Sequence, residues 1–98
     1  MSKQKVQRKR GILIRVTAED IEKGVPHSAA HCPIARAAKR QFGEGVREVL
    51  VCKDDMDVLL TNRSDYYALS RSAGRFIDRF DARRAVYPFS FFATKLLS

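Results

Sequence analysis

The most regular pattern in the chain is an apolar stripe near its C-terminal end. The stripe has the spacing i, i+3, i+4, i+7 and consists of Ala73, Phe76, Ile77 and Phe80. This spacing places the four side chains on one face of a helix. Ser70 or Ser72 can cap the first turn, because a serine hydroxyl accepts a hydrogen bond from a free backbone N–H there. The pattern predicts an amphipathic helix over residues 71–81, which must pack against another element.

Two further helices are predicted before this one. Thr17 followed by Asp20 resembles a capping box at the start of a short helix, which stops at Gly24. A second helix is predicted over residues 33–42, because Pro33 suits a first helical position, where its missing N–H costs nothing. The expected apolar face of this second helix consists of Ile34, Ala37, Ala38 and Phe42.

The remaining apolar segments are typical of strands, since they are short, rich in β-branched residues and bounded by turn residues. They cover residues 12–17, 46–52, 56–62, 66–69 and 86–97. Residues 46–62 indicate an antiparallel hairpin. The order of the elements predicts an α+β fold, a small single domain with a mostly antiparallel sheet and about three helices packed on one side. We assign this domain to residues 11–98 and expect residues 1–10 to form a flexible basic arm.

Length and composition favour a soluble globular domain that stays in the cytoplasm. The chain has 98 residues, of which 45% are hydrophobic and 31% charged, a balance unlike that of disordered proteins. No apolar run approaches the roughly 20 residues of a membrane span, and no secretory signal is evident. Two cysteines do not form a disulfide framework, and we expect both to be thiols.

Charge is the main functional signal, because the formal net charge is +8. The basic side chains fall into three groups: the arm with Lys3, Lys5, Arg8, Lys9 and Arg10, the second helix with Arg36, Lys39 and Arg40, and the last helix and its end with Arg71, Arg75, Arg79, Arg83 and Arg84. Together they could form one surface that binds nucleic acid, a nucleoprotein or an acidic protein face. The alternative is a set of solvated helix faces. Tyr66 and Tyr67 could stack on bases, although at least one is expected to pack in the sheet.

A metal or cysteine site is the other candidate, formed by His27, His31, Cys32 and Cys52. Structural zinc requires paired ligands at defined spacing, and the chain has no Cys-x2-Cys pair. Cys32 lies at a predicted helix start, which lowers a thiol pKa, and a histidine nearby could act as a base. We interpret Cys32 and Pro33 as a helix entry, and we expect no catalytic residue, no metal and no cofactor.

Three short motifs, "VTAEDIEKG", "CPIARAAKR" and "RFIDRFDARRAVYPFSF", occur in this order along the chain. Together they resemble a family of small uncharacterised proteins of tailed bacteriophages and prophages. The matching positions are Val16, Thr17, Asp20, Ile21, Gly24, Cys32, Pro33, Ile34, Ala35, Phe76, Ile77, Phe80, Asp81, Pro88, Phe89 and Phe91. The resemblance spans most of residues 12–92 and implies a phage or mobile-element setting and a cytoplasmic accessory role, with no activity to carry over. The arm and the ending "FFATKLL" depart from the family pattern.

The leading expectation is therefore an accessory protein whose basic surface binds nucleic acid or a nucleoprotein complex. The alternative is a protein that inhibits a host defence system, as anti-CRISPR proteins do, and a weak third is a cysteine-dependent enzyme. A dimer is also possible, because apolar residues gather near the C-terminal end. They are Phe91, Phe92, Leu96 and Leu97.

Overall fold

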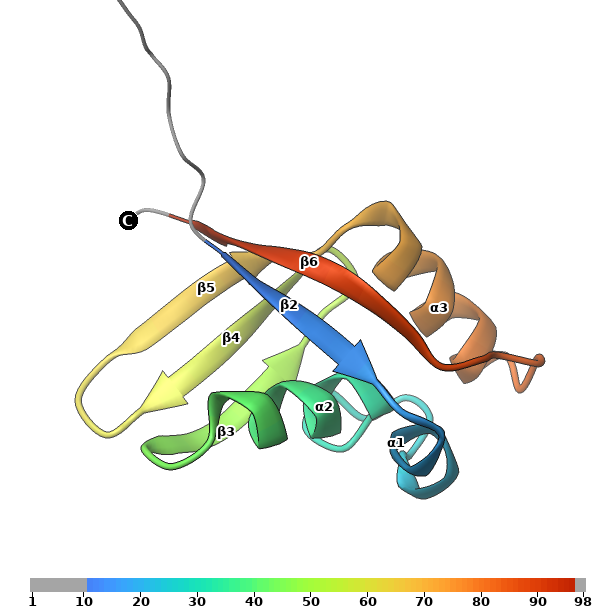
Figure 1. Ribbon diagram of the computed structural model, residues 1–98, viewed down its shortest axis with the longest axis horizontal. Helices are drawn as coiled ribbons and strands as arrows, with labels where there is room; N and C mark the ends of the chain where they lie inside the picture. The colour runs from blue at the N-terminus through green and yellow to red at the C-terminus, as the bar shows by residue number, and fades with distance from the viewer. Residues whose placement is uncertain (1–10, 97–98) are drawn as a thin grey trace, which may run out of the picture.

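The computed structural model describes residues 11–96 as a curled five-stranded sheet with three helices (Figure 1). In chain order the elements are β2 (Gly11–Val16), α1 (Ala18–Lys23), α2 (Pro33–Phe42), β3 (Val46–Val51), β4 (Asp55–Leu60), β5 (Ser64–Ala68), α3 (Arg71–Asp81) and β6 (Phe89–Leu96). The strand order is β2-β6-β5-β4-β3, and all neighbouring strands are antiparallel. The predicted α+β class is confirmed. The predicted arm, residues 1–10, lies outside the described residues.

Side chains alternate between a buried inner face and an exposed outer face of the sheet. The inner face contributes Ile14, Val16, Val49, Val51, Met56, Val58, Tyr67, Phe91 and Ala93 to the core. Helices α2 and α3 complete this core with their own buried side chains. The core therefore lies between the inner face and the two longer helices. The outer face keeps exposed apolar side chains, including Tyr66 and Phe92.

Helix α2 contacts both β2 and β3, although these strands are the two edges of the sheet (Figure 1). The sheet must therefore curl around the helix. Ala35, Ala37 and Ala38 are almost fully buried and allow this close approach, because a methyl group occupies little space. Cys32 caps the helix and Pro33 starts it, as expected.

Side chains of α2 also cover the free edge of β2. Gln41 donates from Nε2 to the Leu13 carbonyl at 2.7 Å and accepts from the Arg15 backbone N–H through Oε1. Arg40 donates from Nη2 to the Arg15 carbonyl at 2.9 Å. An uncovered strand edge is a template for unwanted pairing, so these bonds protect β2 from another chain.

Helix α3 packs its phenylalanine face against the start of β6. Ser70 caps the helix by accepting a hydrogen bond from the Ala73 N–H at 3.3 Å. The rings of Phe76 and Phe89 stack with centroids 4.7 Å apart. The predicted helix over residues 71–81 and its inward face are confirmed. Within residues 11–96, no helix has both the length and the apolar character needed to cross a membrane.

Candidate functional site

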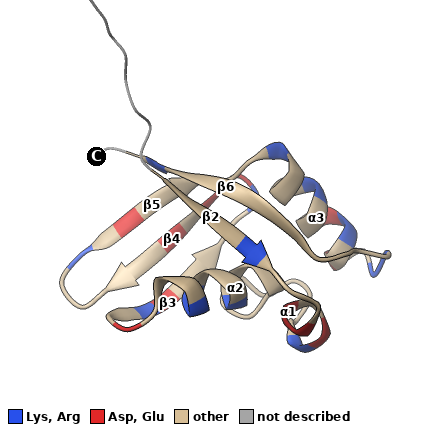
Figure 2. Cartoon of the chain, in the orientation of Figure 1, with Lys and Arg blue, Asp and Glu red and all other residues tan. Residues whose placement is uncertain are grey.

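The basic residues of α3 are exposed and form no ion pair in the described part of the chain. Arg71, Arg75 and Arg79 lie on the solvent side of the helix, opposite its buried residues. None of them has a carboxylate oxygen within 4.0 Å among residues 11–96. Arg83 and Arg84 follow in the exposed turn after the helix. Figure 2 shows these cations along α3 and in the loop that follows it.

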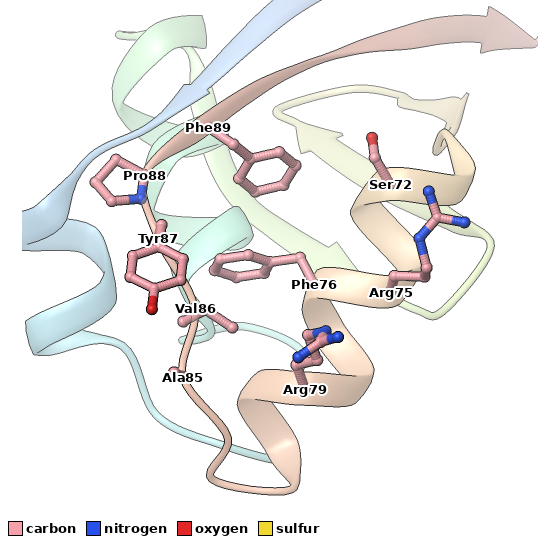
Figure 3. A pocket seen from close by; sticks show the side chains of 9 residues that line it. All are labelled: Ser72, Arg75, Phe76, Arg79, Ala85, Val86, Tyr87, Pro88 and Phe89. Atoms are coloured by element: carbon pink, nitrogen blue, oxygen red, sulfur yellow. The ribbon is translucent and has the colours of Figure 1, made fainter.

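Arg75 and Arg79 border an open groove whose lining, within residues 11–96, contains no acid. Its volume is about 430 Å³, and it lies between α3 and residues 85–89 (Figure 3). Arg71 and Arg75 also line a neighbouring cavity that contains Asp54 and Asp78. The positive charge beside the groove therefore comes from Arg75 and Arg79, and Arg75 also adjoins acidic side chains.

The basic residues of α2 are arranged differently, because two of them surround a buried carboxylate. Asp20 is 0% exposed. Its Oδ1 atom lies 2.6 Å from Arg40 Nη1 and 3.7 Å from Arg36 Nε. Its other oxygen, Oδ2, accepts the Thr17 N–H at 2.9 Å, which completes the predicted capping box. Arg36 and Arg40 thus hold the α1–α2 junction together.

The protonation of Asp20 reflects this environment. Burial on its own would raise the pKa of the Asp20 carboxyl, because it penalises the charged form. The hydrogen bonds from Arg40 and Thr17 outweigh burial and hold the pKa below its usual value. Lys39, the third cation of this group, lines a cavity together with Glu19 and Glu48. The α2 cations therefore lie among acidic side chains and do not form a purely basic surface.

The structure places two of the three predicted groups, those of α2 and α3. The α2 cations and the α3 cations line separate cavities that share no residue. The first group, Lys3 to Arg10, lies outside the described residues, and only its point of attachment at Gly11 is placed. Among the described cations of α2 and α3, Arg75 and Arg79 border the groove that has no acid in its described lining.

Of the four residues considered for a metal or cysteine site, three lie together in the structure. His27, Cys32 and Cys52 line one cavity of about 350 Å³ with Asp78 and Asp81. Within residues 11–96, no group of three or more His, Cys, Asp or Glu side chains is arranged to hold a metal ion.

Cys32 does not have the surroundings of an activated nucleophile. Burial raises the pKa of its thiol, and the backbone N–H groups of Ala35 and Ile34 offset only part of this effect. Its Sγ atom accepts the Ala35 N–H at 3.4 Å as the helix cap. His31 instead lines the cavity next to Asp20. The geometry supports the interpretation of Cys32 as a helix entry.

Of the paired tyrosines, only one is available to a partner. Tyr67 is 8% exposed and faces the core, whereas Tyr66 is 45% exposed on the outer face. The apolar C-terminal residues divide in the same way, since Phe91 is buried and Phe92 is exposed. Leu97 lies outside the described residues.

Sequence reasoning missed Tyr87, which is 74% exposed and lines the groove beside α3. The only signal was its position before Pro88, which restricts it to an extended backbone. Comparison of the chain with protein-family models, curated proteins and solved structures found no match.

Proposed function

We propose that this protein is a non-enzymatic binding protein whose α3 face engages the phosphates of a nucleic acid. The observation that carries the proposal is the pair Arg75 and Arg79, which are exposed, lack acidic partners among the described residues and border a groove without acids. Guanidinium groups suit this role, because their planar N–H donors match phosphate oxygens in a bidentate geometry.

The charge distribution of the chain supports the same function. The net charge is +8, and residues 71–84 hold five arginines but only two aspartates. Asp78 lies 3.3 Å from Lys53 Nζ, and Asp81 accepts the His27 backbone N–H at 2.9 Å. Among the described residues, neither carboxylate lies within 4.0 Å of a basic nitrogen of an α3 arginine, so these arginines are open to phosphates. The arm at residues 1–10 would add non-specific attraction.

The test is the affinity for a labelled DNA strand, measured by fluorescence anisotropy between about 50 and 200 mM salt. We expect binding that weakens steeply with salt, because phosphate contacts release counterions. The double variant Arg75→Gln/Arg79→Gln should weaken binding and lower the slope of log affinity against log salt by about two.

The matched control removes the same charge elsewhere, with Lys39→Gln/Arg47→Gln. Both residues are exposed, and neither lines the groove beside α3. The control should change the affinity less than the α3 variant does. Equal losses would show that net charge alone drives binding, and no binding even at low salt would overturn the proposal. The phage setting, the nucleoprotein target and the host-defence alternative stay predictions.

A further inference from the structure

The groove beside α3 combines a flat aromatic wall with positive charge. Its lining contains the side chains of Phe76, Tyr87 and Phe89. Figure 3 shows the Phe76 and Phe89 rings between the helix and the chain segment opposite, with the Tyr87 ring beside the backbone of that segment. Phe76 and Phe89 form a stacked pair. The volume of about 430 Å³ lies within the range of roughly 300–1,000 Å³ that is typical of ligand sites. The groove can therefore hold a flat ring.

Tyr87 is the unusual member of this lining. It is the most exposed of the large apolar side chains in the described residues, at 74%. Pro88 restricts its backbone, so little backbone freedom is lost when the ring binds a partner. A base can stack on the face of such a ring, and this contact strengthens binding whatever the base is.

The charged and aromatic parts of the groove select one class of occupant. Arg75 and Arg79 come from the helix wall, and Tyr87 comes from the opposite segment (Figure 3). A ligand that contacts both parts must carry a flat aromatic ring and an anionic group. A nucleotide of a nucleic-acid strand has this composition, and its base is free to stack only where the strand is unpaired.

We infer that the groove between α3 and residues 85–89 receives an unpaired base of a single-stranded nucleic acid, with the base on Tyr87 and a neighbouring phosphate on Arg75 and Arg79. This inference rests on the proposed function and narrows its substrate to single strands. The same α3 arginines can contact a duplex through its phosphates, but a paired base cannot enter the groove.

The outer sheet face offers another exposed tyrosine, but its charge is less suitable. Tyr66 lies opposite Asp57 in the β4–β5 pairing and opposite Leu96 in the β5–β6 pairing. A carboxylate beside the ring repels phosphate. Tyr66 is therefore a matched control for Tyr87, because both rings are exposed and only one adjoins unpaired arginines.

The experiment compares a labelled single strand of mixed sequence, about 16 nucleotides long, with the duplex formed by its complement. The native protein should bind the single strand more tightly. Tyr87→Ala should weaken binding to the single strand about 5- to 100-fold, leave binding to the duplex unchanged and keep the salt slope. Tyr66→Ala should change neither affinity. Because the Tyr87 side chain is exposed, circular dichroism of Tyr87→Ala should match that of the native protein.

A second measurement uses the absence of tryptophan from the chain. The variant Tyr87→Trp places a single indole in the groove, and the single strand should quench its fluorescence while the duplex should not. If single strand and duplex bind equally and Tyr87→Ala has no effect, the inference is wrong but the proposed function stands. If Tyr66→Ala alone removes the preference, the base binds the sheet face instead. If neither nucleic acid binds at low salt, the proposed function itself fails.

Discussion

Helices α2 and α3 both present arginines at helical spacing, but the two sets have different surroundings. On α2, Arg36 and Arg40 surround the buried Asp20. On α3, Arg75 and Arg79 face an open groove and form no ion pair among the described residues. The same residue type thus stabilises the fold in one helix and is free to bind a partner in the other. The difference arises from what lies opposite, a carboxylate in one case and an aromatic segment in the other.

The largest effect is expected at Asp20, on which the α2 arrangement depends. Asp20→Asn should lower the free energy of unfolding by about 3 kcal/mol, because it removes a buried charge partner and weakens the capping box. Urea denaturation of the native and variant proteins would measure the difference. Asp78→Asn is the matched control, since the Asp78–Lys53 pair is exposed and should contribute less than about 1 kcal/mol. A similar small loss for both variants would contradict a structural role for the α2 arginines.

The ion pair of Asp20 should also make the free energy of unfolding depend on pH, with a smaller effect. The pKa of Asp20 lies below its ordinary value of 3.8 in the folded protein. The stability that ionised Asp20 contributes to the fold is therefore fully present at pH values above its ordinary pKa. This stability is lost as the pH falls through the lower pKa that Asp20 has in the folded protein. The difference in unfolding free energy between the native protein and Asp20→Asn should stay constant from pH 7 to about pH 5 and shrink below about pH 4. A difference that grows on acidification would contradict the assigned ion pair.

Most of the fold was predictable from local signals. The helices over 33–42 and 71–81 begin and end where Pro33, Ser70 and the apolar spacing indicate. The strand starts are less accurate: β4 begins at Asp55 rather than at 56, β5 at Ser64 rather than at 66, and β6 at Phe89 rather than at 86. Helix caps and apolar spacing depend only on residues close together in the chain, so they can be predicted from the sequence alone.

The candidate site was predictable only in part, because it depends on contacts between distant segments. Asp20 and Arg40 are 20 positions apart, and no local pattern indicates their ion pair. Tyr87 reaches α3 only because β6 pairs between β2 and β5 and brings residues 85–89 back along the helix. Residue spacing correctly placed the arginines of α3 on one face. It could not show that the arginines of α2, at similar spacing, contact a buried carboxylate instead.

The central claim, that α2 arginines stabilise the fold and α3 arginines bind a partner, is tested most directly by comparing two single variants. Arg40→Gln should lower the free energy of unfolding by about 1–2 kcal/mol, since half of the side chain is exposed, and should keep most of the DNA affinity. Arg75→Gln should change stability by less than about 0.5 kcal/mol and weaken DNA binding, with a salt slope smaller by about one. Urea denaturation and anisotropy titration of both variants give the result. If Arg40→Gln weakens binding as much as Arg75→Gln does, or leaves stability unchanged, the distinction between the two helices is wrong.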